Sequence, residues 1–253
     1  MFRKFDVKDD FFKEINSEAK AYLLGFFVAD GTYNLGTRCT DSYRFQIKQQ
    51  DIDKCVVDWF HELIVPTASI NYKNPYVDKK GVHHKGSYTL RWSSKTMHKD
   101  LQEFNIYPRK TFDVNFEFPF YKIPLEYHWD FIRGFFDGDG QASYSDVTHQ
   151  FTFGMVGTSE AYMTQIGKMF EKEFGVEMHL LSRQRTNMIM YELRFSAGWD
   201  RKTFITKLYK KFYKNKKYFL PRKQINILKY LLFKYRDNSE DCERLQNIVE
   251  RRG

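Results

Sequence analysis

The chain has 253 residues, enough for two domains of ordinary size, and carries a formal net charge of +9 at pH 7, which indicates an acidic partner such as nucleic acid. Its three cysteines, Cys39, Cys55 and Cys242, form no CxxC pair, which argues against a zinc site or a disulfide framework. No apolar run is long enough for a secretory signal or a membrane span, so we expect an intracellular protein that does not bind membranes.

The predicted elements begin with a helix that includes residues 21–29. Asn16 or Ser17 is its expected N-cap, and Gly31 is its expected end. In residues 43–49 apolar and polar side chains alternate, which is typical of a strand with one buried face. The other elements expected in this half are strands at 33–37, 68–77 and 87–93, helices at 52–63 and 95–104, and a Pro-Arg-Lys element at 108–110.

Residues 116–124 contain two prolines and little periodicity, and we expect them to link two units, 1–115 and 125–253. After the linker the same order of elements returns. The expected elements are a helix at 125–138, strands at 141–145 and 150–156, a helix at 159–174, strands at 177–185 and 188–196, helices at 199–213 and from 221 to about 235, and a charged terminal helix at 238–253. Each unit is therefore α-β-β-α-β-β-α, which predicts an α+β fold of two pseudo-symmetric units.

One stretch of the sequence occurs twice, and other motifs repeat with it. Residues 23–31 read Leu-Leu-Gly-Phe-Phe-Val-Ala-Asp-Gly, and residues 132–140 read Ile-Arg-Gly-Phe-Phe-Asp-Gly-Asp-Gly, with the last aspartates 109 positions apart. The other repeated pairs are 88–94 with 191–197 and Pro-Arg-Lys at 108–110 with Pro-Arg-Lys at 221–223. Three motifs repeated in the same order indicate a duplicated domain.

The duplicated stretch points to a metal site. Its small residues lie four positions apart on one helix face, at Gly25 and Ala29 and at Gly134 and Gly138. Small residues at this spacing let two helices approach closely, which would bring Asp30 and Asp139 together. Two adjacent carboxylates at helix C-termini repel each other, so a divalent cation such as Mg²⁺ or Ca²⁺ is the expected partner. A single Asp-Gly pair would be an ordinary helix end; the duplication favours the metal site.

The polar faces of the predicted strands point to nucleic acid. Their side chains are of the kinds that hydrogen-bond to base edges and phosphates, with almost no acid among them. The candidate DNA-binding residues are Asn34, Arg38, Arg44, Gln46, Lys48, Asn71, Lys73 and Arg91 in the first unit, and Gln141, Ser143, Gln150, Thr152, Arg183, Arg185 and Arg194 in the second. Residues 201–236 add thirteen Lys or Arg and no acid, interleaved with aromatic residues that indicate folded structure.

The two stretches resemble the paired motifs of single-chain LAGLIDADG homing endonucleases, and the order of the repeats is similar to that family across nearly the whole chain. The resemblance implies that the two units pack through the motif helices. It also implies that the two antiparallel sheets form a saddle over a long DNA site. The activity it implies is site-specific, metal-dependent hydrolysis of phosphodiester bonds in double-stranded DNA.

In that family the last acidic residue of each motif binds metal, which maps to Asp30 and Asp139 here. The carbonyl before it, of Ala29 or Gly138, commonly contributes as well. The resemblance therefore implies Mg²⁺ as the cofactor, with Ca²⁺ able to occupy the sites without supporting cleavage.

The family also tends to carry a glutamine at the end of the second strand, which maps to Gln49 and would order water near the scissile phosphate. Gly157 replaces this glutamine in the second unit, so the two half-sites are not equivalent. Lys110 and Lys223 look like the basic pair that stabilises developing phosphate charge, with the arginine before each as the alternative.

Other functions stay open at this point. An intron maturase, which would bind intron RNA, or a non-cleaving nucleic-acid binder could share the fold, although the presence of both motif aspartates favours the nuclease. A structural repeat protein would explain the basic balance poorly. Because both units lie in one chain, we expect a monomer that reads an asymmetric site, in a bacterial or phage-infected cytoplasm or an organelle matrix.

Overall fold

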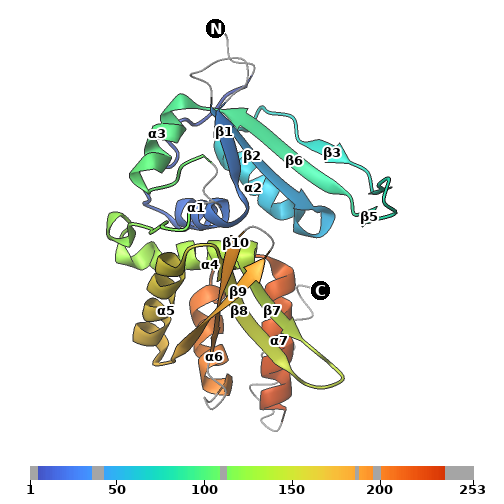
Figure 1. Cartoon of the computed structure of the whole chain (residues 1–253), viewed down its shortest axis with the longest axis vertical. Coiled ribbons are helices and arrows are strands. Elements are labelled where there is room, and N and C mark those ends of the chain that lie inside the picture. Colours follow the sequence, from blue (N-terminus) through green and yellow to red (C-terminus); the bar gives the residue numbers. More distant parts are fainter. Residues whose placement is uncertain (1–4, 36–42, 109–112, 186–187, 196–200, 237–253) are drawn as a thin grey trace. The chain divides into compact units, whose positions relative to one another are not determined.

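The structure, a computed structural model, describes residues 5–35, 43–108, 113–185, 188–195 and 201–236 (Figure 1). Contacts divide the chain into two compact units: unit 1 is Met1–Thr111 with Phe118–Phe131, and unit 2 is Phe112–Glu117 with Ile132–Gly253. Residues of interest from the sequence that lie outside the described ranges are Arg38, Cys39, Arg109, Lys110, Cys242 and the tail 238–253.

Unit 1 follows the predicted order of elements. Helix α1 (Glu18–Asp30) begins after Ser17, whose side chain accepts a hydrogen bond from the backbone N–H of Lys20, as expected of an N-cap. The elements that follow are β1 (Thr32–Leu35), β2 (Tyr43–Gln50), α2 (Lys54–Ile64), β3 (Asn71–Lys73), β4 (Tyr76–Val77), β5 (His83–His84), β6 (Ser87–Ser93) and α3 (Lys95–Glu103).

The main sheet of unit 1 is antiparallel and has the strand order β1-β2-β6-β3. Strand β2 shows why the sheet has one covered face, because Phe45, Ile47 and Gln49 are buried while Arg44 and Lys48 on the opposite face are exposed. Helix α2 packs against β2 and β6. The other face of the sheet carries the exposed polar side chains.

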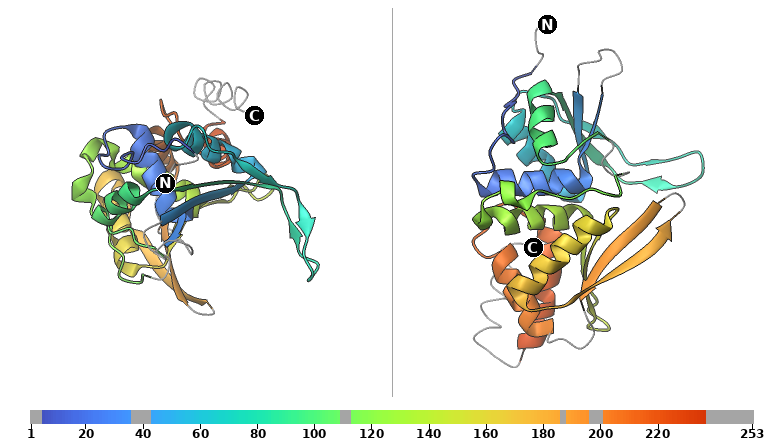
Figure 2. Two further views of the ribbon diagram at one scale, coloured as in Figure 1. Left: turned by 90° about the horizontal axis from the view of Figure 1, so that it is seen from above. Right: turned by 60° about the vertical axis from the view of Figure 1, so that its left-hand side comes forward.

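One predicted strand of unit 1 is broken in the structure. A single strand was expected at 68–77, but β3 covers only Asn71–Lys73, and β4 pairs with β5 in a separate two-stranded ribbon. Pro75 lies between β3 and β4 and has no backbone N–H to donate to a ladder. The ribbon extends away from the unit 1 sheet (Figure 2).

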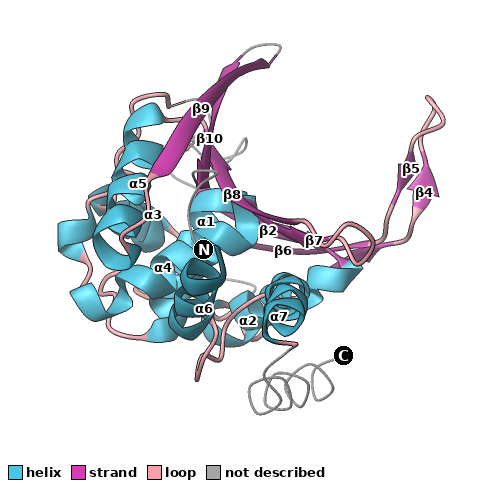
Figure 3. Cartoon of the chain, turned by 90° about the horizontal axis from the view of Figure 1, so that it is seen from below, coloured by secondary structure: helices cyan, strands magenta, loops and turns pink. Residues whose placement is uncertain are grey.

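Unit 2 repeats the topology of unit 1. Its elements are the part of α4 (His128–Asp139) from Ile132 onward, β7 (Gly140–Tyr144), β8 (Phe151–Gly157), α5 (Glu160–Phe174), β9 (Met178–Arg185), β10 (Met188–Phe195), α6 (Arg201–Phe212) and α7 (Pro221–Tyr235). Helix α4 starts later than predicted because Leu125–Tyr127 form a 3₁₀ turn. The sheet order is β7-β8-β10-β9, in which the four strands take the same places as in unit 1. Strands β9 and β10 run side by side in Figure 3. The predicted α+β fold with two pseudo-symmetric units is confirmed.

Each core is built on the second phenylalanine of the repeated stretch. The ring centroid of Phe27 lies 6.1 Å from that of Phe45 in β2, and the centroid of Phe136 lies 4.9 Å from that of Phe153 in β8. All four side chains are buried. In the part of the chain that the structure describes, no helix is both long and apolar enough to cross a membrane.

The glycine that ends each repeated stretch is required by close packing. A Cβ atom at Gly31 would overlap the ring and the carbonyl oxygen of Phe27, and one at Gly140 would overlap the same groups of Phe136. The backbone of Gly31 is extended, with a φ of −72°, so crowding and not a left-handed backbone conformation excludes a side chain. The same local constraint therefore shapes both units.

Substitution of either glycine by alanine should destabilise the fold. We expect Gly31→Ala and Gly140→Ala each to lower the free energy of unfolding by about 1–3 kcal/mol, the usual cost of overpacking. The measurement is urea unfolding followed by circular dichroism. The matched control is Gly167→Ala in α5, where the nearest atom is the flexible Leu193 Cδ2 at 3.3 Å. Wild-type stability for both motif variants would contradict the packing argument.

Candidate functional site

The first predicted site residue, Asp30, ends helix α1 with an exposed side chain. Gln49 lies one residue before the end of β2, on the buried side of the strand with Phe45 and Ile47. Its Nε2 donates a hydrogen bond of 3.0 Å to Asp30 Oδ2. The structure therefore brings together two residues that the sequence assigned to one site, and Gln49 fixes the direction of the carboxylate.

The second predicted aspartate, Asp139, ends helix α4 with a half-buried side chain. Its charge affects Tyr162, a fully buried residue of α5. Burial raises the pKa of the Tyr162 hydroxyl well above its ordinary value, and the negative charge of Asp139 raises this pKa further. Tyr162 was not identified from the sequence, because an aromatic residue on the buried face of a helix is usually a core residue.

The strand register shows that Gly157 takes the place of Gln49 in unit 2. Gln49 pairs with Tyr88 of the repeated Tyr-x-Leu-Arg motif, and Gly157 pairs with the equivalent residue, Tyr191. A Cβ atom at Gly157 would lie 2.7 Å from Met163 Sδ and 3.9 Å from the ring of Phe135. A side chain at this position would therefore require Met163 to move.

Lys223, the predicted basic residue of unit 2, belongs to helix α7, and its side chain reaches the C-terminal end of α4. Its side chain is buried, and its Nζ donates hydrogen bonds to the backbone carbonyl oxygens of Phe136, Asp137 and Gly140 at 2.5, 2.7 and 2.8 Å. The sequence pattern placed a lysine at the site but could not show that its side chain turns to the helix backbone. The corresponding Lys110 lies outside the described residues.

The donor groups at the two helix ends suit a hard divalent cation. Asp30 and Asp139 each supply a carboxylate, and Ala29 and Gly138 supply the carbonyl before it, and Mg²⁺ and Ca²⁺ prefer oxygen donors of these kinds. Mg²⁺ is commonly held by one or two carboxylates together with water and substrate phosphates. Among the described residues, no group of three or more His, Cys, Asp or Glu that could hold a metal occurs.

The polar face of the unit 1 sheet is formed by rows of side chains that cross the strands. Arg44 pairs with Asn34 on one side and Ser93 on the other, and Gln46 pairs with Arg91, whose Nε donates to Gln46 Oε1 at 2.7 Å. All predicted contact residues of this unit that the structure describes are exposed or half-exposed: Asn34, Arg44, Gln46, Lys48, Asn71, Lys73 and Arg91.

The polar face of the unit 2 sheet contains an acid that the sequence analysis missed. Glu192 is the only Asp or Glu in the strands that the structure describes, and its carboxylate accepts a 2.7 Å hydrogen bond from Arg194 Nε and lies 3.5 Å from Arg183 Nη2. Two predicted contact arginines are thus held by one carboxylate. The predicted contact residues of this unit are exposed or half-exposed: Gln141, Ser143, Gln150, Thr152, Arg183, Arg185 and Arg194.

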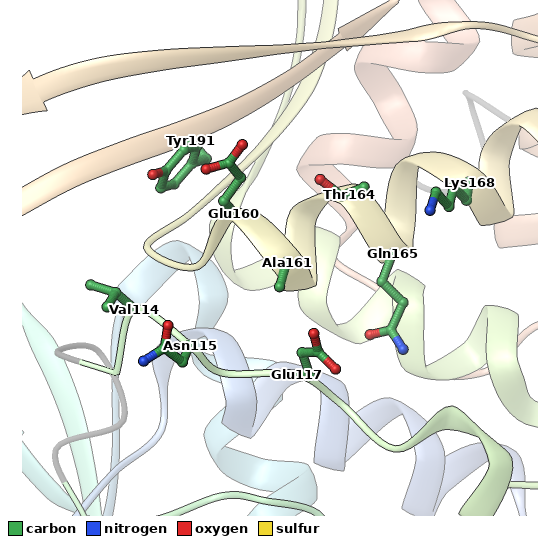
Figure 4. Close-up of a pocket in the computed structure, with 9 residues that line it drawn as sticks. All are labelled: Val114, Asn115, Glu117, Glu160, Ala161, Thr164, Gln165, Lys168 and Tyr191. Carbon is green, nitrogen blue, oxygen red and sulfur yellow. The ribbon is translucent and has the colours of Figure 1, made fainter.

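A separate cavity of about 660 Å³ lies in unit 2 between α5 and the segment 114–117 (Figure 4). Its walls carry both signs of charge and none of the predicted site residues. Tyr191 forms part of its edge, and its pKa is raised by burial and further by the charge of Glu160 and a hydrogen bond to it. The lining residues are Val114, Asn115, Glu117, Glu160, Ala161, Thr164, Gln165, Lys168 and Tyr191.

Solved structures share the fold of this chain at low sequence identity. The homing endonuclease I-WcaI, solved bound to its DNA recognition sequence, superposes with a TM-score of 0.54 over 85% of this chain and 90% of that one, at 10% identity. The chain has the LAGLIDADG homing endonuclease fold. A structure of mesophilic variants of the homing endonuclease I-DmoI matches at a TM-score of 0.48, with 16% identity over 76% of this chain and 94% of that one.

The N-terminal LAGLIDADG domain of WhiA also matches, at a TM-score of 0.42 and 14% identity, over 86% of this chain and 95% of that domain. No protein-family model and no curated protein sequence matches the chain. The match to I-WcaI establishes the LAGLIDADG fold, and the resemblance inferred from the repeated stretches is confirmed.

A glutamine introduced at position 157, to match Gln49 of unit 1, should not be accommodated by this single substitution. We expect Gly157→Gln to lower the free energy of unfolding by about 1–3 kcal/mol, because its Cβ would overlap Met163. Adding Met163→Ala should make room for the new side chain. In a double-mutant cycle measured by urea unfolding, the loss of unfolding free energy in the double variant should be smaller, by about 1 kcal/mol, than the sum of the losses in the two single variants. Strict additivity would show that Met163 does not limit the position.

Proposed function

We propose that the protein is a site-specific endonuclease that hydrolyses phosphodiester bonds in double-stranded DNA with a divalent metal. The observation that carries the proposal is the equivalence of Asp30 and Asp139, which end the same helix at the same turn into the first strand in two units of this fold. A purely structural Asp-Gly end would not need the hydrogen bond that Gln49 donates to Asp30.

In this proposal Asp30 and Asp139, with the carbonyl oxygens of Ala29 and Gly138, hold the metal, most simply Mg²⁺. A bound divalent cation would activate water and stabilise the leaving oxygen of the DNA backbone. Gln49 holds the Asp30 carboxylate and supplies an amide group that can order water beside it. Unit 2 has no such amide at Gly157, so we propose that the two strands are cut at different rates.

We propose that the polar faces of the two sheets bind DNA. Arginine, lysine, glutamine and asparagine side chains supply phosphate contacts and hydrogen bonds to base edges. The two faces carry different residues, for example Gln46 with Arg91 in unit 1 and Arg194 with Glu192 in unit 2. A single chain with two different faces suits an asymmetric site and a monomer.

A second candidate is a nucleic-acid-binding protein on this fold that does not cleave, such as an intron maturase that binds intron RNA. The observation that favours it is the state of unit 2, where Gly157 lacks the amide of Gln49 and Lys223 is buried against the α4 backbone. The presence of both motif aspartates, and the Gln49 contact in unit 1, favour the nuclease.

The nuclease proposal is tested by substitution of the two aspartates. We expect Asp30→Asn and Asp139→Asn each to reduce cleavage of at least one strand by 100-fold or more, on the order of the loss seen when a stabilising group is removed from a phosphoryl or acyl transition state. The measurement is strand-resolved cleavage of a selected DNA target in Mg²⁺. DNA affinity measured in Ca²⁺ should stay near that of the wild type.

Two results would decide against the assignment. If either variant cuts both strands as fast as the wild type, the assigned aspartate is not part of the metal site. If the wild type binds DNA tightly but cleaves neither strand with Mg²⁺ or Mn²⁺, the non-cleaving candidate is correct.

The DNA-binding face of unit 2 is tested at Glu192. Since its carboxylate holds Arg194 and Arg183, Glu192→Gln should free both guanidinium groups for phosphates. We expect tighter DNA binding at low salt and a steeper decline with salt, by about one or two additional phosphate contacts in a plot of log K against log salt.

The matched control is Glu171→Gln, which removes the same charge from the exposed surface of helix α5. This variant should leave the salt dependence near that of the wild type. Weaker binding by Glu192→Gln would show instead that the carboxylate itself accepts a hydrogen bond from a base.

A further inference from the structure

Lys223 is buried, although lysine is among the residues least often found inside proteins. Only 2% of the residue is exposed. Its Nζ donates to the carbonyl oxygens of Phe136, Asp137 and Gly140 at 2.5, 2.7 and 2.8 Å. A lysine ammonium group has three N–H donors. All three point to backbone oxygens of unit 2, which offsets the cost of removing the charge from water.

These three oxygens lie where helix α4 ends and strand β7 begins. The last four carbonyls of a helix have no partner within the helix, and the helix dipole makes this end negative. The ammonium group of Lys223 donates hydrogen bonds to these carbonyls, and its positive charge is favourable at the negative end of the dipole. Its acceptors at Asp137 and Gly140 lie on either side of Asp139 in the chain. One side chain therefore holds the backbone on both sides of the motif carboxylate.

The segment before Lys223 is attached to α4 as well. The backbone N–H of Leu220 donates to Asp137 Oδ2 at 2.7 Å, and Arg133 Nε donates to the carbonyl oxygen of Tyr218 at 2.8 Å. Arg133 and Asp137 are both buried. The last two turns of α4 are thus tied to residues 218–223 by both side chains and backbone.

Helix α7 continues the attachment along strand β7. Lys223, Asn226 and Lys229 follow one another at three-residue spacing, which places them on one face of the helix. Asn226 Nδ2 donates to the carbonyl oxygen of Ala142 at 3.0 Å, and Lys229 Nζ lies 2.8 Å from Asp146 Oδ2. Lys223 is the buried member of this row, and Lys229 is its half-exposed member.

We propose that Lys223 is a positioning residue: it fixes the end of α4 through backbone carbonyls, thereby setting the place of Asp139, and it does not contact DNA phosphate. The reason is the use of its donors, because an ammonium group engaged with three carbonyls has no N–H left for a phosphate oxygen. The proposal rests on the proposed function only for the role of Asp139 in cleavage. The two units then hold their aspartates differently, with the Gln49 side chain in unit 1 and the Lys223 backbone contacts in unit 2.

The first test does not depend on activity. Lys223→Met keeps the length of the side chain and removes the ammonium group, and Lys229→Met makes the same change on the same helix outside the α4 junction. In hydrogen exchange of the full chain without DNA or metal, we expect amides in residues 136–142 to exchange roughly tenfold faster or more in Lys223→Met, because a hydrogen-bonded charged group is lost there. Lys229→Met should leave this segment at the wild-type rate.

The second test separates positioning from phosphate contact. For Lys223→Met we expect the Mg²⁺ concentration for half-maximal cleavage to rise several-fold for one strand, while the salt dependence of DNA binding in Ca²⁺ keeps its wild-type slope. A slope shallower by about one phosphate contact would overturn the proposal. Unchanged exchange in residues 136–142 would overturn it as well, and so would wild-type cleavage of both strands despite faster exchange.

Two provisions keep the outcomes distinct. If Lys223→Met does not fold, the test uses Lys223→Gln, whose side chain retains two N–H donors. In this variant the amides of residues 136–142 should exchange faster than in the wild type, but more slowly than in a protein with no donor at position 223. Exchange as in the wild type would overturn the proposal for this variant too. If the wild type cleaves no DNA with any divalent cation, the proposed function fails, while the exchange measurement still tests Lys223.

Discussion

An aspartate at the C-terminal end of a helix is opposed by the helix dipole and sits among carbonyls that lack partners, and the rest of each unit depends on how that junction is stabilised. In unit 1 the backbone N–H of Gly31 caps Phe27 and the Gln49 amide binds Asp30. In unit 2 the ammonium group of Lys223 binds the corresponding carbonyls beside Asp139. Both solutions allow the chain to enter a strand immediately after the aspartate, so the sheet starts at the candidate site.

Features that depend on neighbours in sequence could be predicted, and features that depend on side-chain direction could not. The order of elements followed from periodicity and from the repeated motifs, and the resemblance to a known family placed Gln49 in the same site as Asp30. The break at Pro75 was missed because the apolar and aromatic residues on both sides resemble one continuous strand. That Lys223 turns to the helix backbone, and that Glu192 lies beside two arginines, depends on contacts between elements distant in sequence.

The difference between the units is larger than the single exchange of Gln49 for Gly157. Met163 and Phe135 lie next to the position where unit 2 lacks the amide. In addition, the charge of Asp139 contributes to the raised pKa of the buried Tyr162 hydroxyl. The packing at Gly157 and the buried hydroxyl of Tyr162 therefore distinguish the surroundings of Asp139 from those of Asp30.

The net charge of +9 is a poor measure of the charge available to DNA. Much of it comes from residues 201–236, where Lys211 pairs with Glu173, Lys229 pairs with Asp146, and Lys223 is buried at the helix junction. Helix α7 packs against β7, so its inward lysine serves the fold and not a partner. On the polar face of the unit 2 sheet, the carboxylate of Glu192 likewise engages Arg194 and Arg183, so part of the positive charge of that face is also balanced within the fold.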